Sequence, residues 1–126
     1  MAVITLTKAN FKETIESNPF VIVDFWAPWC EPCMIFTETF KQVAENHPDI
    51  VFGMVDIEID PEISDYFDVE KIPGIMVIRD QASILTQVGE LGGPALEEII
   101  KWARSYEMKD VHTWYAEQDS KGKAVR

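Results

Sequence analysis

A nearly uninterrupted run of β-forming apolar residues constrains the fold of this chain most strongly. Residues 20–26 read FVIVDFW, in which only one position is charged. A strand so continuously apolar is typical of the centre of a sheet that is covered on both faces. A helix is predicted soon after it and ends near Pro48. Its apolar residues share one stripe at helical spacing: Phe36, Phe40, Val43, Ala44 and His47.

The remaining predicted elements alternate strands with helices, in the order βαβαβαββα. They are a strand at 3–6, a helix from about 7 or 10 to 18, a strand at 50–56, a helix at 61–67, strands at 75–78 and 84–88 with a turn near 80–83, and a last helix that opens at 92–94. This order predicts the α/β class. The expected architecture is a central mixed sheet of four to five strands, largely parallel in its first half, with helices on both faces.

The length and charge of the chain limit its class and its partners. With 126 residues, it is long enough for one domain with its own core. A net charge of −11 argues against nucleic acid or an anionic membrane as a partner, because both would repel the protein. No apolar run approaches the ~20 residues of a membrane span.

The N-terminal residues bear on the compartment. The opening sequence MAVITL has neither a basic stretch nor a long apolar segment, so no secretory signal is predicted and a cytoplasmic location is expected by default. In such reducing surroundings Cys30 and Cys33 are not expected to form a permanent structural disulfide. Metal binding or redox chemistry is favoured instead.

The sequence predicts neither a zinc site nor a calcium site. Zinc needs four ligands, and only His47 and His112 could join the two cysteines, neither of them at finger spacing. The acidic stretch at residues 56–62 is interpreted as a solvated face rather than a calcium loop. Pro61 stands where such a loop needs its turn-forming glycine.

Cys30 and Cys33 stand one helical turn apart at the predicted start of a helix. That spacing puts them on one side, close enough for a disulfide. Cys30 would lie at the helix N-terminus, where unpaired N–H groups stabilise a thiolate, so it is the expected nucleophile. Cys33, one turn deeper, is suited to resolving a mixed disulfide, and Pro32 is tolerated in the first turn. The alternative, two small buried apolar residues, is disfavoured by the strand before them and the helix after them.

Two separated motifs resemble those of the thioredoxin family. The first is VIVDFWAPWCEPC at residues 21–33, which looks like the family's active-site strand and turn. The second is VEKIP at residues 69–73, which is similar to the family's proline loop, and Val88-Gly89 before the last helix also resembles the family. The resemblance covers about residues 1–107 and implies a thioredoxin-like fold there. Residues 108–126 are then a charged C-terminal extension, expected to form a short helix or a mobile tail.

The resemblance also implies roles that the residue pattern alone leaves open. Asp24 could be desolvated, with a raised pKa, or could reach water at a strand end; the resemblance implies a proton acceptor for Cys33. Because most X–Pro bonds in folded proteins are trans, the residue pattern alone predicts a trans bond between Ile72 and Pro73. The resemblance implies instead a cis proline facing the cysteines, with the Ile72 backbone pairing with an extended substrate segment.

An apolar rim beside the cysteines is expected to dock substrate. It would comprise Trp29 with Trp26 and Pro28, although Trp26 could equally be a plain core aromatic. The full set of implied substrate-binding residues is Trp29, Pro32, Ile72, Pro73 and Gly89.

Several positions depart from the family's usual pattern. Thioredoxins commonly carry Gly-Pro between the cysteines and a Lys after them, where this chain has Glu31 and Met34, and Met54 replaces a frequent Lys on the third strand. Because a carboxylate disfavours a nearby thiolate, we predict a higher pKa for Cys30 than a Glu31→Gly variant would have. Gly74 follows the proline in place of the usual Thr, which concerns how partners dock.

The leading functional hypothesis is a protein-disulfide reductase that uses Cys30, Cys33 and Asp24 and needs no bound cofactor. Its expected substrates are proteins that contain disulfides, and the resemblance implies a thioredoxin reductase using NADPH as the electron donor. A monomer is expected. The alternative is a binding or chaperone-like module of the same fold with a regulatory dithiol, and an oxidase or isomerase would differ only in reduction potential.

Overall fold

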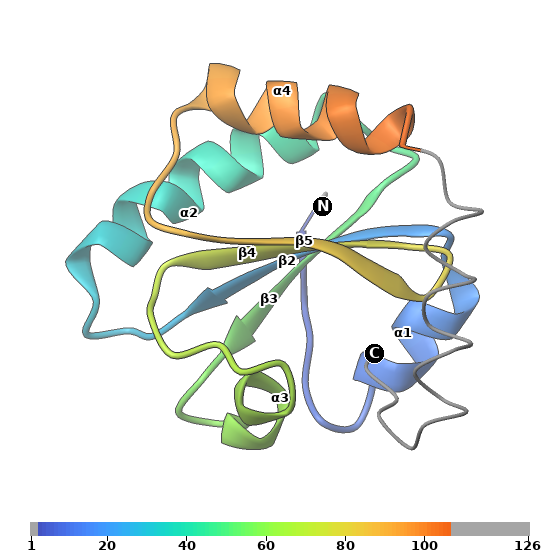
Figure 1. Ribbon diagram of the computed structural model, residues 1–126. Coiled ribbons are helices and arrows are strands. Elements are labelled where there is room, and N and C mark those ends of the chain that lie inside the picture. Colours follow the sequence, from blue (N-terminus) through green and yellow to red (C-terminus); the bar gives the residue numbers. More distant parts are fainter. Residues whose placement is uncertain (1–2, 107–126) are drawn as a thin grey trace.

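The computed structural model describes residues 3–106 and contains the predicted strands and helices in the predicted order (Figure 1). The predicted extension at residues 108–126 lies outside the described part. The elements are β1 (Val3–Thr5), α1 (Phe11–Ser17), β2 (Phe20–Trp26), α2 (Glu31–Ala44), β3 (Val51–Asp56), α3 (Pro61–Tyr66), β4 (Gly74–Arg79), β5 (Ala82–Val88) and α4 (Gly93–Arg104).

The strands form one mixed sheet in the order β1-β3-β2-β4-β5. β1, β3 and β2 are parallel, whereas β4 runs antiparallel to both β2 and β5. The central position predicted for β2 is therefore confirmed, and so is the largely parallel first half. The carboxyl end of β2 leads directly into the loop before α2.

Helices cover both faces of the sheet, as predicted. Figure 1 shows α2 and α4 on one side and α1 and α3 on the other. Successive side chains of β2 alternate between the two layers. Phe20 and Ile22 pack into the cluster that contains the apolar faces of α2 and α4. Val21, Val23 and Phe25 pack into the cluster that also contains Ile63 of α3 and is joined by residues of α1. Burial on both faces explains why the strand has no polar alternation.

α2 is shorter than predicted. It ends at Ala44, so the placement of His47 on its helical stripe was wrong. The His47 amide donates a hydrogen bond to the Ala44 carbonyl at 3.1 Å, an i to i+3 contact typical of a tightened helix end. The His47 ring contacts α4 instead, where Nε2 lies 2.7 Å from a carboxylate oxygen of Glu97.

The turn between β4 and β5 is also tighter than predicted. It consists of Asp80 and Gln81, with φ of 51° and 69°, the left-handed backbone that two-residue hairpin turns require. Ala82 and Ser83 therefore belong to β5 rather than to the turn. The Asp80 amide donates to the Pro19 carbonyl at 2.8 Å, which ties the turn to the start of β2.

Residues 3–106 lack two other kinds of feature. None of the helices there is both long and apolar enough to cross a lipid bilayer. The same residues contain no group of three or more His, Cys, Asp and Glu side chains that could hold a metal ion.

Candidate active site

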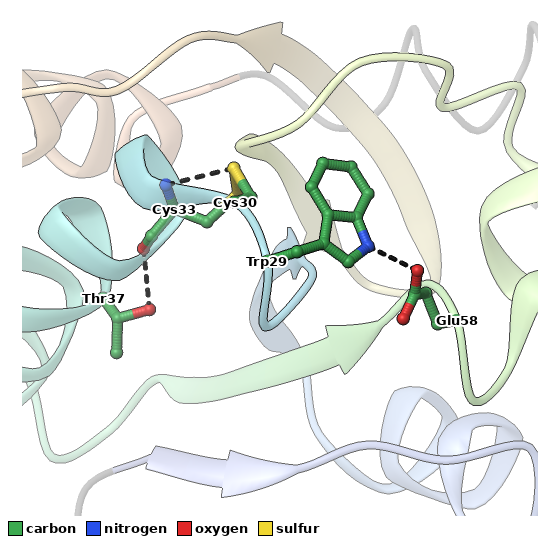
Figure 2. Close-up of a disulfide and its surroundings, with 5 residues drawn as sticks. All are labelled: Trp29, Cys30, Cys33, Thr37 and Glu58. Carbon is green, nitrogen blue, oxygen red and sulfur yellow. Dashed lines mark hydrogen bonds between the residues drawn. A yellow bond between two sulfur atoms is a disulfide. The ribbon is translucent and has the colours of Figure 1, made fainter.

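A disulfide joins Cys30 and Cys33 at the N-terminus of α2 (Figure 2). Their Cα atoms are 5.2 Å apart. Cys30 is the N-cap residue, in an extended conformation, and Cys33 lies in the first turn of the helix. The predicted proximity of the two cysteines is confirmed, and the structure represents the oxidised state of the pair.

The N-terminus of α2 supplies a backbone hydrogen-bond donor to Cys30. The Cys33 amide donates to Cys30 Sγ at 3.2 Å, in the manner of a helix cap. After reduction, the same amide and the positive end of a 14-residue helix would favour a thiolate at Cys30 over a thiol. Pro32 stands in the first turn, where its missing N–H removes no helical hydrogen bond. The helix N-terminus thus favours a thiolate at Cys30 once the pair is reduced.

The two sulfur-bearing residues differ in access. Cys30 exposes 6% of its surface, whereas Cys33 exposes none. The Cys33 carbonyl accepts a hydrogen bond from the Thr37 hydroxyl at 2.9 Å, and Thr37 is itself buried. Thr37 was not singled out from the sequence, although its spacing of one helical turn from Cys33 was a usable signal. An attacking group from another molecule can reach Cys30 more easily than Cys33.

An apolar cluster packs around the disulfide. Ala27, Cys30 and Cys33 form its buried part, and the half-buried residues packed against it are Trp26, Ile57 and Ile72. Trp26 is therefore a partly buried neighbour of the pair rather than an open rim residue. The cluster brings Ile72, from the loop before β4, to the cysteines.

The proline loop has the predicted cis bond between Ile72 and Pro73. Pro73 is buried, and its carbonyl accepts a hydrogen bond from the Gly89 amide at 2.8 Å. Gly89 has φ of +105°, a conformation that side chains rarely adopt, although a Cβ atom there would meet no atom within 4 Å. Glycine is therefore favoured here by the backbone conformation and not by a lack of space. The hydrogen bond of its amide connects the end of β5 to the proline loop.

Asp24 is a buried carboxyl group in the middle of β2. Its exposed fraction is zero, and neither carboxyl oxygen has a hydrogen-bond partner among the described residues. Its register neighbours are Met54 on β3 and Ile75 on β4, so no charge compensates it from the adjacent strands. Burial raises the pKa of Asp24 to about 7. The predicted desolvation is confirmed, and the alternative of a strand-end Asp that reaches water is wrong.

Trp29 and Glu58 form a contact that the sequence analysis missed. Trp29 exposes 65% of its surface, and its indole Nε1 donates a hydrogen bond to the Glu58 carboxylate (Figure 2). Glu58 belongs to the acidic stretch that was interpreted only as a solvated face. The two residues are 29 positions apart, so no local pattern could connect them.

Glu31 and Met34 are both exposed on the first turn of α2. Neither supplies a positive charge near Cys30, and Glu31 places a carboxylate on the neighbouring residue. We therefore still expect the Cys30 thiolate to be less favoured beside Glu31 than it would be beside a neutral residue.

That expectation can be measured on the reduced protein. The Glu31→Gly and Glu31→Gln variants should titrate Cys30 at a lower pKa than wild type, because both remove the negative charge. Thiolate absorbance in the ultraviolet reports the titration. The glutamine variant controls for the backbone freedom that glycine adds. Equal titration midpoints in all three proteins would contradict the expectation.

Comparison with known proteins agrees with this geometry. The thioredoxin family model matches residues 2–104. A Streptomyces coelicolor protein named putative thioredoxin 2 is 42% identical over 117 residues, which cover 93% of this chain and 87% of that protein. Thioredoxin of Mycobacterium tuberculosis is 34% identical over 97 residues, which cover 75% of this chain and 84% of that protein.

Solved structures support the same assignment. The oxidized form of mitochondrial thioredoxin 3 from Saccharomyces cerevisiae superposes with a TM-score of 0.73 at 28% identity, covering 79% of this chain and 94% of that one. A Plasmodium falciparum thioredoxin gives a TM-score of 0.72, also at 28% identity, over 78% of this chain and 95% of that one. The thioredoxin-like fold is therefore confirmed. By its sequence, its fold and the cysteine pair at the start of α2, this chain belongs to the thioredoxin family, whose members are thiol–disulfide oxidoreductases that reduce protein disulfides.

Proposed function

We propose that Cys30 attacks substrate disulfides, that Cys33 resolves the mixed disulfide, and that Asp24 accepts the Cys33 proton. The observation that carries this assignment is the difference in access, 6% for Cys30 against 0% for Cys33. The attacking sulfur must lie in line with the S–S bond of the substrate. This geometry needs room around the attacking sulfur, which favours the more accessible Cys30. Resolution is intramolecular, so a buried Cys33 can perform it.

The exchange transfers two electrons in two steps. The Cys30 thiolate attacks one sulfur of the substrate disulfide, so a mixed disulfide forms and one substrate thiolate leaves. Cys33 then loses its proton and attacks Cys30 Sγ, which forms the Cys30–Cys33 disulfide and releases the second substrate thiolate. The substrate gains two electrons, and its two thiolates take up protons from water. Asp24 later releases the Cys33 proton to water, and the protein is left in the oxidised state of this structure.

Asp24 suits the second step because of its pKa and its position. A group with a pKa of about 7 can take up and release a proton near neutral pH. Strand alternation puts Asp24 on the same face of β2 as Phe20 and Ile22, the face covered by α2, which carries Cys33. The absence of any hydrogen-bond partner for Asp24 in residues 3–106 leaves both of its oxygens open to accept that proton.

Substrate docking is assigned to the surface around Cys30. Trp29 and Pro32 are exposed beside it, while Pro73 and Gly89 hold the loop that presents Ile72 to the disulfide. In this proposal the Ile72 backbone pairs with an extended substrate segment, a form of strand addition.

The proposal extends to the setting of the reaction. Each exchange leaves the two cysteines oxidised, so the reducing equivalents must come from another protein. By the family resemblance, that donor is a thioredoxin reductase using NADPH. The protein acts as a cytoplasmic monomer. Residues 1–107 form the catalytic domain, and residues 108–126 are a charged C-terminal extension.

Trapping the mixed disulfide tests the roles of the two cysteines. A Cys33→Ser variant should accumulate covalent adducts with disulfide substrates, because Cys30 still attacks but nothing resolves the product. Adducts are counted on non-reducing gels and identified by mass spectrometry of the peptide linked to Cys30.

The matched control is Cys30→Ser, which keeps one thiol but in the buried position. It should form few or no adducts. Adducts that form as readily through Cys33 would reverse the assigned roles. No adduct with either variant would favour the alternative of a binding module with a regulatory dithiol.

A further inference from the structure

The Trp29–Glu58 pair, two hydrogen-bonded side chains, includes the residue that precedes the proposed nucleophile. Trp29 precedes Cys30 in the chain, and its indole N–H donates to the Glu58 carboxylate (Figure 2). The bond holds an indole that is 65% exposed. A large aromatic surface with a carboxylate at its edge is thus carried by the residue that precedes the attacking cysteine.

Glu58 keeps spare capacity to bind a cation. A carboxylate offers about four acceptor positions, of which the Trp29 N–H occupies one. Within residues 3–106, the salt bridges involve other carboxylates, and none includes Glu58. The charge of Glu58 therefore has no basic side chain of this part of the protein to neutralise it.

The start of α2, the proline loop packed against the disulfide and the end of β5 bonded to that loop carry more negative charge than positive. Glu31 follows Cys30, Glu70 lies in the proline loop, and Glu90 follows Gly89, and all three are exposed. Lys71 is the exposed base on the same segments. With a net charge of −11 for the chain, this rim should attract and orient basic partners more than acidic ones.

We infer that the Trp29–Glu58 pair recognises a lysine or arginine side chain that lies close to the disulfide of the substrate. The inference rests on the proposed attack by Cys30 and names the class of substrate that the site prefers. The alkyl stem and cationic head of such a residue can lie over the indole while the head pairs with Glu58. An exposed ion pair and an exposed cation–π contact are each weak, and together they predict a preference of about fivefold.

A set of matched peptides tests the inference. Each peptide carries one intramolecular disulfide and differs only in one flanking residue, which is Arg, Gln or Glu. Reduced protein is mixed with each peptide at low ionic strength in a stopped-flow instrument, and the second-order rate constant is measured. Each rate is divided by that of dithiothreitol with the same peptide, which removes the effect of the flanking charge on the peptide's own reactivity.

Two variants locate the preference on the protein. In Glu58→Gln the side-chain oxygen can still accept from Trp29, but the charge is gone. Glu45→Gln removes the same charge from an exposed position just beyond the other end of α2, about 20 Å along the helix from Cys30. Wild type and Glu45→Gln should react about fivefold faster with the Arg peptide than with the Gln peptide, and slowest with the Glu peptide. In Glu58→Gln this selectivity should fall to about twofold or less, and salt at about 0.5 M should reduce it in wild type.

Two results would overturn the inference in different ways. Equal relative rates for the three peptides, or a preference that Glu58→Gln retains in full, would remove the assigned role of the pair while leaving disulfide reduction intact. Failure of wild type to reduce any of the peptides would remove the proposed function and the inference with it.

Discussion

Catalysed reduction of insulin by dithiothreitol should fall to the uncatalysed rate when Cys30 is replaced with serine. The serine hydroxyl has nearly the same size but cannot form a disulfide, and it is not ionised near neutral pH, so neither step of the exchange can occur. The precipitation of the reduced insulin B chain, followed as turbidity, measures the rate. This is the largest effect on activity expected from any single substitution in the chain.

The comparison requires that the variant remain folded. Cys30 caps α2 and lies in the apolar cluster around the disulfide, so the proper reference is reduced wild type, in which the disulfide is also absent. Similar urea unfolding curves for the two would show that a loss of activity is chemical. A substantial rate in Cys30→Ser would instead mean that the dithiol is incidental to what the protein does.

Replacement of the Asp24 carboxyl by a group that cannot ionise should remove a loss of stability that the oxidised wild type shows as pH rises. The same replacement should slow the second step of exchange, which starts from the mixed disulfide. Burial raises the Asp24 pKa in the folded protein to about 7, against an ordinary value of 3.8 in the unfolded chain. Between these values the folded state binds the proton more tightly. Stability therefore falls as pH rises from about 4 to about 7 and stays low above that. A shift of this size corresponds to about 4 kcal/mol.

The Asp24→Asn variant cannot ionise and should lose this pH dependence. Its unfolding free energy relative to wild type should rise by about 3–4 kcal/mol between pH 4.5 and pH 9. The change across pH is the test, because the buried amide has its own constant desolvation cost. Urea unfolding followed by tryptophan fluorescence provides the free energies. The same variant should accumulate mixed disulfides during turnover, since Cys33 has lost its proton acceptor.

A matched control separates this effect from the loss of any surface charge. Asp65→Asn changes an exposed carboxylate on α3 and should keep the pH profile of wild type. Parallel profiles for wild type and Asp24→Asn would contradict both the raised pKa and the assigned proton transfer. Asp24 would then be an unpaired structural residue.

The sequence was sufficient wherever the deciding interactions are local. The continuous apolar pattern of residues 20–26 predicts a strand that is buried on both faces, and β2 packs against a helical layer on each side. The spacing of Cys30 and Cys33 at a helix start determines their proximity, because one helical turn brings them together whatever surrounds them. Helix ends were less certain, since the stripe continues to His47 while the helix ends at Ala44.

The tertiary structure decided everything that depends on contacts between distant segments. From the residue pattern, Asp24 could have reached water; only the packing of β3, β4 and the covering helices removes it from solvent and raises its pKa. Glu58 could be seen only as one acid among several until folding placed it on the Trp29 indole. A short-range pattern records what neighbouring residues do to one another, whereas burial and hydrogen bonding across the sheet are set by the whole chain. The sequence by itself therefore determined the dithiol and the layers around it. The fold decided the proton acceptor's environment and the surface that a substrate meets.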